Sequence, residues 1–174
     1  IMATPDFVLN LRKRIGHELL WLNGVTAVVE DADGRMLMGR RADTGEWALV
    51  YGINEPGEQP ADTVVREVKE ETGMDVEVTD LVSVISSDRI ITYANGDRTQ
   101  YMDHAFLCRP REGGNVKPFV GDEESLAVGW FDPEHLPEPL AASTVERLGV
   151  LRTYLDAKRR GDAHARFVTQ GTLR

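Results

Sequence analysis

Apolar and polar positions alternate with two different periods along the chain, which predicts a mixture of strands and helices. Residues 24–30 (GVTAVVE) are rich in β-branched side chains, and residues 35–40 form a second apolar segment, so both are predicted as strands. The dipeptide Asp33-Gly34 between them is typical of tight hairpin turns. We therefore predict that these two strands pair with each other.

The same pattern returns later in the chain. Residues 76–86 alternate between apolar and polar side chains, which predicts another strand. Residues 90–93 and 99–107 flank Asn95-Gly96-Asp97, a turn sequence that predicts a second hairpin. Residues 126–131 are predicted as a last short strand.

Three segments carry the helical period instead. Residues about 5–20 and 144–160 each place their apolar side chains on one face, and they predict an N-terminal and a C-terminal helix. A helix between them is predicted to start near Pro60, since proline suits the first turn, and to stop at Gly73. Its apolar stripe recurs at i, i + 3, i + 4 and i + 7: Ala61, Val64, Val65 and Val68.

Strands that interleave with helices, with hairpins among the strands, favour an α/β fold in which a mixed sheet is flanked by helices. A chain of 174 residues suffices for one domain with a sizeable core, and neither a repeat nor a linker is visible. A single domain over residues 1–174 is therefore expected. The tail from Gly161 is expected to be poorly ordered.

Composition narrows the environment and the partners. A net charge of −9 argues against a nucleic acid polymer as the main partner. No apolar run reaches the ~20 residues that span a bilayer, and no secretory signal opens the chain, where Ile1 before Met2 reads as an expression addition. The single Cys108 excludes an intramolecular disulfide and fits the reducing cytosol, so a cytoplasmic location is expected.

The central helix carries an acidic cluster beside its apolar stripe. Glu67, Glu70 and Glu71 recur at i, i + 3 and i + 4, and their mean direction lies roughly 120° from that of the stripe. The carboxylates therefore border the edge that faces the core, where the floor of a cleft would lie. A run of this kind on its own is more often a solvated helix face, relieved in part here by Arg66 and Lys69.

Carboxylates at this density also invite a cation. Neighbouring like charges cost a few tenths of a kcal/mol each, and hard oxygen donors favour Mg²⁺ or Mn²⁺ over zinc. No His or Cys stands close enough in the sequence to suggest a zinc site. A bound metal can invert the local field, so the net charge does not exclude a small phosphate ester.

Residues 52–74 also resemble the signature of the Nudix (MutT-like) hydrolases. That signature is glycine, five residues, glutamate, seven residues, then R-E-U-x-E-E-x-G-U with U apolar. The chain has GINEPGE, QPADTVV and REVKEETGM, and it matches at every specified position. The fixed spacing of the glycines, Glu58 and Arg66 favours a metal site over a solvated helix face. The resemblance is looser over residues of about 22–135.

The resemblance implies an α/β/α sandwich and a metal-dependent hydrolase, with dimers common in the family. It implies metal ligands at Glu67, Glu70 and Glu71, and we place Glu70 and Glu71 among the catalytic groups as well. Glu58 is implied as a further ligand or as a group behind the ligands. The backbone carbonyl near Gly52 often joins the metal set.

Other site residues follow from their position near this motif. Arg66 is interpreted as orienting a neighbouring glutamate rather than touching substrate. A general base in the family often lies on a loop before the last strand, where Glu124 is our choice and Glu123 the second. A solvated acidic loop is the alternative. Arg40 and Arg41 end a predicted strand near the motif, where one of them could grip phosphate or form a surface salt bridge.

One residue departs from the family pattern. Many members precede the motif with Pro-Gly-Gly, whereas this chain has Val50-Tyr51-Gly52. A tyrosine resists backbone conformations that glycine permits. Tyr51 therefore either reshapes the loop that carries the carbonyl near Gly52 or points into the pocket as a substrate contact. For Trp47 a structural role is favoured over stacking on a base.

The leading hypothesis is a Mg²⁺- or Mn²⁺-dependent hydrolase of a nucleotide. Its substrate would be a nucleoside diphosphate linked to another moiety, such as ADP-ribose or a dinucleotide, or a nucleoside triphosphate. A non-catalytic Nudix module that binds a nucleotide is the second hypothesis, although the motif is intact. An isomerase of the isopentenyl diphosphate type is the third, but that chemistry uses a cysteine and Cys108 is poorly placed. Arg89 stands where typical ADP-ribose pyrophosphatases have a proline.

Overall fold

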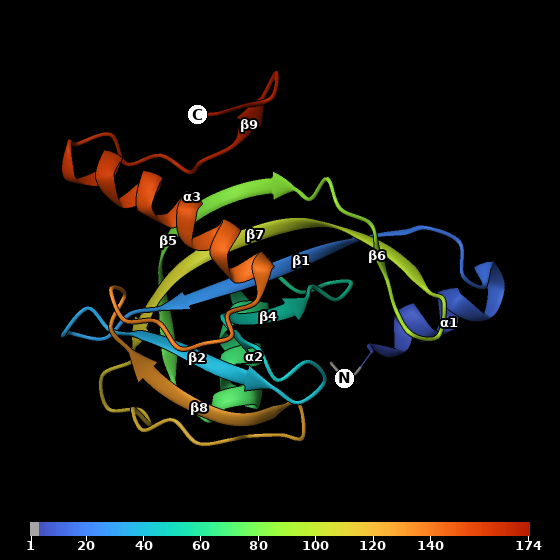
Figure 1. Ribbon diagram of the computed structural model, residues 1–174, viewed down its shortest axis with the longest axis horizontal. Coiled ribbons are helices and arrows are strands. Elements are labelled where there is room, and N and C mark those ends of the chain that lie inside the picture. Colours follow the sequence, from blue (N-terminus) through green and yellow to red (C-terminus); the bar gives the residue numbers. More distant parts are fainter. Residues whose placement is uncertain (1–3) are drawn as a thin grey trace.

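A computed structural model describes residues 4–174 (Figure 1), so the interpretation of Ile1 and Met2 lies outside the described residues. The elements, in chain order, are α1 (Asp6–Ile15), β1 (Leu20–Val29), β2 (Met36–Arg41), β3 (Trp47–Ala48), β4 (Val50–Ile53), α2 (Pro60–Thr72), β5 (Val76–Ser86), β6 (Ile91–Thr92), β7 (Arg98–Pro110), β8 (Ser125–Phe131), α3 (Ala142–Arg159), β9 (Val168–Thr169) and β10 (Thr172–Leu173).

The strands form a large mixed sheet and a smaller antiparallel one. The large sheet has the order β4-β1-β7-β5, with β6 paired to β7, and the small sheet has the order β3-β2-β8. Strands β1 and β7 run parallel, whereas β4, β5 and β6 pair antiparallel with their neighbours. The predicted α/β class with a mixed sheet is therefore confirmed.

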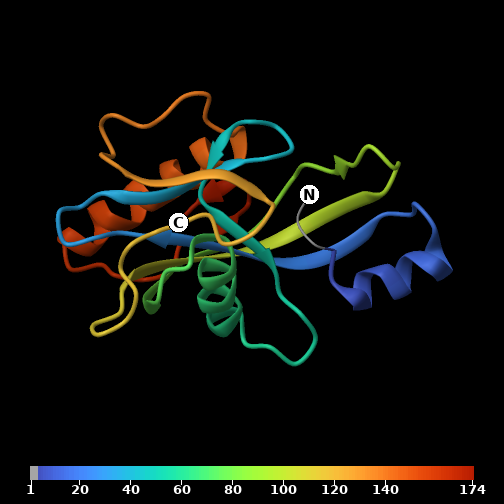
Figure 2. The same cartoon turned by 90° about the horizontal axis from the view of Figure 1, so that it is seen from below.

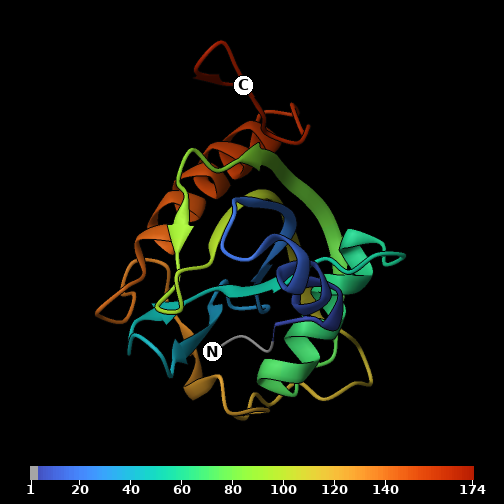
Figure 3. The same ribbon diagram turned by 90° about the vertical axis from the view of Figure 1, so that its right-hand side faces the viewer.

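Helices α2 and α3 lie on opposite sides of the large sheet, which produces three layers (Figures 2 and 3). Successive side chains of β1 point to opposite faces of the sheet, so they contribute to two hydrophobic cores, one beneath α2 and one beneath α3. Val25, Ala27 and Val29 pack in the α2 core with Val64 and Val68. The intervening residue Val28 instead joins the α3 core, which contains Leu148 and Leu151.

The first predicted hairpin is wrong. Glu30, just after β1, forms an isolated antiparallel bridge with Met36 of β2. Beyond that bridge β2 pairs with β3 and β8 in the small sheet, while β1 pairs with β4 and β7. The Asp33-Gly34 turn forms, but the chain changes sheet there. Local turn chemistry therefore predicted the reversal and not the partner strand.

Two terminal expectations also need correction. Helix α1 ends at Ile15 rather than near residue 20, because Gly16 stops it and β1 already begins at Leu20. The tail after Gly161 is built into the fold through a parallel bridge between Ser83 and Arg166, whose exposure is only 6%.

The hairpin at Asn95-Gly96-Asp97 is confirmed by the pairing of β6 with β7.

Helix α1 lies at the far end of β1, away from α3 (Figure 1). Val8 packs there against Leu22 and Ile53 in a small third core. Arg12 links the helix to the start of β7 by donating a hydrogen bond to the carbonyl of Arg98, at 2.7 Å. Across residues 4–174, no helix is both long and apolar enough to cross a membrane.

Candidate active site

Helix α2 carries the predicted acidic residues and spans Pro60–Thr72, with proline at its start. Gly73 ends it in the left-handed conformation, with φ of 67°, and its N–H donates to the carbonyl of Lys69. Val64 and Val68 are completely buried, which fixes the rotation of the helix on the sheet. That rotation determines where each glutamate points.

The glycine at the start of the motif allows Glu67 to lie against the backbone of β4. A Cβ atom at Gly52 would stand 2.2 Å from Cγ of Glu67, which is far inside van der Waals contact. Only glycine fits there without displacing the carboxylate. Close packing between Gly52 and Glu67 therefore explains why the motif has glycine at this distance from the glutamate.

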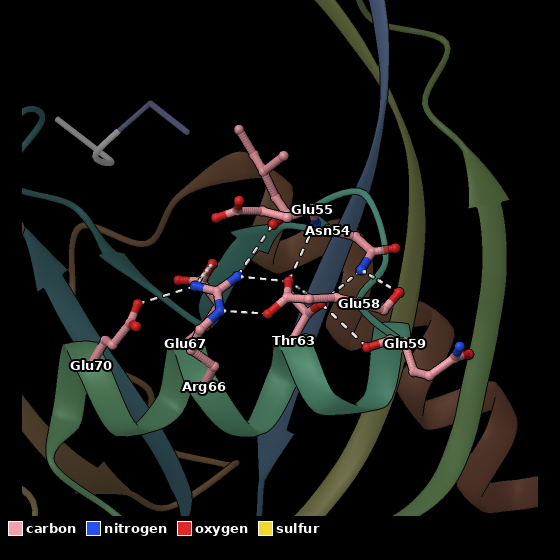
Figure 4. A network of polar contacts seen from close by, with 9 residues as sticks. Asn54, Glu55, Glu58, Gln59, Thr63, Arg66, Glu67 and Glu70 are labelled. Carbon is pink, nitrogen blue, oxygen red and sulfur yellow. Dashed lines mark hydrogen bonds and ion pairs between the residues drawn. The ribbon is translucent and has the colours of Figure 1, made fainter. Parts of the chain in front are cut away.

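Arg66 connects three glutamates (Figure 4). Its Nε and Nη2 donate to the two carboxylate oxygens of Glu58, at 2.8 and 3.0 Å. Its Nη1 donates to Glu67 at 2.9 Å and to Glu70 at 3.1 Å. The fork of the guanidinium thus grips Glu58 bidentately and reaches the other two carboxylates with its remaining nitrogen.

Other groups complete the binding of Glu58. The hydroxyl of Thr63 donates to its carboxylate at 2.9 Å, and the side-chain amide of Asn54 donates to that hydroxyl at 2.7 Å. The backbone N–H of Glu55 also donates to the carboxylate. We call Asn54, Glu58, Thr63 and Arg66 the Glu58 cluster. Thr63 was not predicted as a site residue, although it is polar and lies one turn before Glu67 at the edge of the apolar stripe.

The Glu58 cluster is electrostatically satisfied. The side-chain hydrogen bonds from Arg66 are the largest influence and hold the pKa of Glu58 at about 2, despite the opposing effect of burial. Thr63 and the backbone of Glu55 lower the pKa further. Glu58 therefore stays ionised with its hydrogen-bonding capacity in use.

Glu67 and Glu71 behave in the opposite way. Burial raises the pKa of Glu67 to about 7, although Arg66 opposes that shift. Burial also raises the pKa of Glu71 well above its usual value, and the nearby charges of Glu67, Glu124 and Asp122 raise it further. Arg41 is the cation that offsets the charge on Glu71. At this end of the helix, burial and neighbouring carboxylates together outweigh the effect of Arg66 and Arg41 on the two pKa values.

The loop before β8 brings Glu124 to this end of α2. The N–H groups of Phe119 and Gly121 donate to the carbonyls of Thr72 and Glu71 at the helix end, at 3.0 and 2.9 Å. A Cβ atom at Gly121 would stand 2.0 Å from the carbonyl oxygen of Glu70, so the approach requires glycine. We call Glu67, Glu71, Asp122 and Glu124 the Glu71 cluster.

A small cavity joins four of the predicted residues. Arg41, Tyr51, Glu71 and Glu124 all line it, together with Asp43 and Ser125. Arg41 forms two hydrogen bonds with Asp43, at 2.9 and 2.6 Å. Asp43 was not predicted as a partner of Arg41, although it lies only two residues along the chain.

Tyr51 is held on the side of the cavity that faces α3. Its hydroxyl lies 2.6 Å from the hydroxyl of Thr144, which also accepts the N–H of Leu49 at 3.2 Å. The guanidinium of Arg147 lies over its ring, 4.6 Å from the centroid. The strand leading into Gly52 is therefore fixed to the start of α3.

Other expected residues are not among those that line this cavity. Arg40 is exposed and donates to the carbonyl of Gly45. Glu123 is exposed on the loop, and the side chain of Glu70 is 54% exposed on the face where Arg66 reaches it. Trp47 packs edge-on against Phe131, 4.8 Å between ring centroids, in the α3 core.

Whether these residues suit a divalent metal depends on charge and donor type. Within residues 4–174, no three carboxylate, imidazole or thiol groups are gathered closely enough to hold a metal ion. The Glu71 cluster nevertheless supplies only hard oxygen donors, and burial disfavours the charge on Glu67 and Glu71 more than the nearby arginines favour it. Both properties fit Mg²⁺ or Mn²⁺. Cys108 is buried, and its pKa is raised to about 12, so it does not contribute a thiolate.

Comparison with known proteins covers most of the chain. A model of the NUDIX domain matches residues 21–151. A MutT-like protein of Streptomyces ambofaciens is 40% identical over 124 residues, which cover 71% of this chain and 72% of that protein. The 8-oxo-dGDP phosphatase NUDT18 of Mus musculus is 33% identical over 147 residues. That match covers 83% of this chain but only 41% of the relative.

Solved structures give the same result. The crystal structure of an ADP-ribose pyrophosphatase from Streptococcus suis superimposes with a TM-score of 0.64. The two proteins are 27% identical, and the match covers 84% of this chain and 98% of the other. The arrangement of layers described above is thus shared with this solved pyrophosphatase.

Proposed function

Because the chain belongs to the NUDIX hydrolase family, we propose that it cleaves a pyrophosphate bond in a nucleotide with the help of Mg²⁺ or Mn²⁺. The observation that carries the proposal is the Glu71 cluster, where carboxylates of α2 whose charge is disfavoured by burial lie beside Glu124 of the β8 loop. Glu67 and Glu71 are assigned as metal ligands, with Glu70 and the carbonyl of Gly52 completing the set.

The protein groups then divide the work. When bound, the metal neutralises charge on the phosphate oxygens and polarises the bond that breaks. Glu124 is assigned to accept a proton from the attacking water, because it lines the cavity beside Glu71. Arg41 is assigned to grip a phosphate after exchanging its contact with Asp43. Tyr51 forms the wall that limits the position of the substrate.

The Glu58 cluster has a supporting role in this proposal. Glu58 was implied either as a ligand or as a group behind the ligands, and its contacts with Arg66 favour the second alternative. Arg66 would orient Glu67 and Glu70 for the metal. Of the predicted substrate residues, Arg40 has the weakest support because it lies outside the cavity.

The substrate is proposed as a nucleoside diphosphate, free or linked to another moiety, or a nucleoside triphosphate. The printed names of the relatives, 8-oxo-dGDP phosphatase and ADP-ribose pyrophosphatase, suggest which compounds to test first. A cytoplasmic location and a homodimer, a common state in the family, belong to the same proposal.

The test is hydrolysis by the purified chain with Mg²⁺ on 8-oxo-dGDP, ADP-ribose, dinucleoside polyphosphates and nucleoside triphosphates. We expect turnover of at least one compound, its loss on chelation of the metal, and its loss in Glu71→Gln. Asp62→Asn, on the exposed face of the same helix, is the matched control and should retain activity. Equal turnover by Glu71→Gln would contradict the assignment of Glu71, and turnover of none would contradict the function.

A further inference from the structure

A second, larger cavity lies beside the Glu58 cluster. It is enclosed by α1, the start of β1 and the loop between β4 and α2. Its volume of about 370 Å³ falls within the range of small-molecule sites, roughly 300–1,000 Å³. The cavity that contains Glu71 and Glu124 shares none of its lining residues. The two cavities are therefore lined by different parts of the chain.

Trp21 gives this cavity an aromatic surface. It lies on β1 between Leu20 and Leu22, which turn toward the small core around α1. Trp21 lines the cavity as well, and it is 60% exposed. Phe7 and Leu11 of α1 add further apolar lining. An exposed indole at the edge of a cavity is a platform on which a planar ring can stack.

Polar side chains line the same cavity. Asn23 and Glu55 both border it, and neither side chain makes a hydrogen bond or ion pair with any residue of 4–174. Asn54 also lines it, but its amide nitrogen already donates to Thr63 and to the carbonyl of Glu58. A carboxylate accepts two adjacent N–H groups, whereas an amide can donate or accept. The lining therefore suits a ring that carries N–H donors along one edge.

The cavity connects with the proposed catalytic groups through one residue. Glu58 forms part of its lining, and Arg66 links Glu58 to Glu67. Figure 4 shows Glu55 and Glu58 on the loop that covers the start of α2, on the same side of the helix as Glu67. A ligand whose ring occupied the cavity would extend its phosphates toward that side.

We propose that this cavity binds the nucleobase of the substrate, stacked on Trp21 with Glu55 accepting its N–H groups. The ring class is a purine with adjacent N–H donors, as guanine presents, because a carboxylate pairs with two such donors and repels a ring that offers acceptors. Asn23 provides a further polar contact at the rim. The inference deepens the proposed function and rests on it for the phosphates, while base binding can be measured without catalysis.

The test is calorimetric titration of GMP, AMP and ribose 5-phosphate into the full chain in metal-free buffer. We expect GMP to bind more tightly than AMP, and ribose 5-phosphate not to bind. Trp21→Ala should weaken GMP by about tenfold or more, and Trp21→Phe should retain binding within about threefold. Glu55→Gln should weaken GMP by about tenfold and AMP by less than threefold.

Matched controls separate base binding from damage to the fold. Phe167→Ala removes an aromatic ring of similar exposure from the C-terminal tail, and Glu112→Gln neutralises an exposed carboxylate on the loop after β7. Both should bind GMP as the unaltered chain does. Thermal unfolding should show Trp21→Ala to be folded, since the side chain it removes is largely exposed.

Equal binding of GMP by the unaltered chain, Trp21→Ala and Glu55→Gln would overturn the proposal, as would the absence of GMP binding. Hydrolysis in the substrate panel together with either result would leave the enzymatic function intact and remove only this base site. GMP binding that depends on Trp21 and Glu55, without hydrolysis of any compound, would support the cavity and contradict the enzymatic function.

Discussion

The Glu58 and Glu71 clusters both include side chains of α2 and differ in how burial and hydrogen bonding affect their carboxylates. In the Glu58 cluster one carboxylate receives two hydrogen bonds from Arg66 and one from Thr63, and its pKa falls to about 2. In the Glu71 cluster burial and neighbouring carboxylates raise the pKa of both Glu67 and Glu71. One cluster is complete without a ligand and the other is not.

This difference separates the glutamate that stabilises the folded state from the glutamates that are suited to binding a cation. A satisfied carboxylate contributes to the folded state, whereas buried carboxylates of like charge destabilise it until a cation binds. Buried carboxylates that destabilise the folded protein in this way are expected where a metal ion binds. The comparison supports the proposal that the Glu58 cluster has a supporting role and that the Glu71 cluster binds the metal.

The largest expected effect is that of Glu71→Gln. Removing one buried charge from the proposed metal site should lower kcat by about 10²–10³-fold. The same change should raise the melting temperature in metal-free buffer, because the substitution removes a carboxylate that burial disfavours. Steady-state kinetics and thermal unfolding of one preparation test both. A fall in activity accompanied by a lower melting temperature would indicate that Glu71 is structural.

Much of the fold could be predicted from periodicity. Helix α2 follows the predicted boundaries because Pro60 and Gly73 mark its ends and the apolar stripe fixes its face. The partner of β2 could not be predicted, because Asp33-Gly34 specifies a turn and not the sheet that the next strand joins. The order of the tail was also missed, since burial of Arg166 depends on a strand far away in the sequence.

The site divides in a similar way. The glutamates of α2 could be predicted because helical spacing places them on one edge. The approach of Glu124 was predicted from the family resemblance alone. Its physical cause, hydrogen bonds from the β8 loop to the end of α2 and the close contact at Gly121, is visible only in three dimensions. The same holds for Thr144, which reaches Tyr51 across 93 residues.

The next effect concerns the Glu58 cluster. Arg66→Met should leave three carboxylates without their shared partner, costing about 1–3 kcal/mol of the free energy of unfolding, after allowance for its partial exposure. Activity should fall about 10–100-fold, as when groups that orient metal ligands are removed. Arg66→Lys should recover only part of each loss, because lysine lacks the bidentate fork. Chemical denaturation and kinetics provide the measurements, and full recovery by lysine would contradict the bidentate role.

A smaller effect is expected from Gly121→Ala. The added methyl group would meet the carbonyl of Glu70, so the β8 loop must move and carry Glu124 away from Glu71. We expect kcat to fall about tenfold, in line with the general-base contribution of about 10²–10⁴ that a misplaced base loses in part. Gly149→Ala on α3, where a Cβ atom meets nothing within 4 Å, is the matched control. Equal kinetics for the two variants would separate Glu124 from the chemistry.

The two clusters should also respond to pH with opposite signs. The folded-state pKa of Glu58 is lowered to about 2 from 4.5, so its contribution is present above pH 4.5 and is lost as the pH falls toward 2. The folded-state pKa of Glu67 is raised to about 7, so its contribution is present below pH 4.5 and is lost as the pH rises through 7. Melting temperatures of the unaltered chain, measured in chelator against Glu58→Gln and Glu67→Gln, should show these opposite trends. Parallel trends would remove the distinction between the clusters.

The most direct test of that distinction is calorimetric titration of Mg²⁺ into the unaltered chain, Glu71→Gln and Glu58→Gln at one pH. If the Glu71 cluster holds the metal, Glu71→Gln should abolish measurable binding of Mg²⁺. Glu58→Gln should weaken binding by no more than about 10–100-fold, which is the effect of removing a group that supports the ligands. Abolition of binding by Glu58→Gln, with binding retained in Glu71→Gln, would show that the metal belongs to the other cluster and would contradict the account.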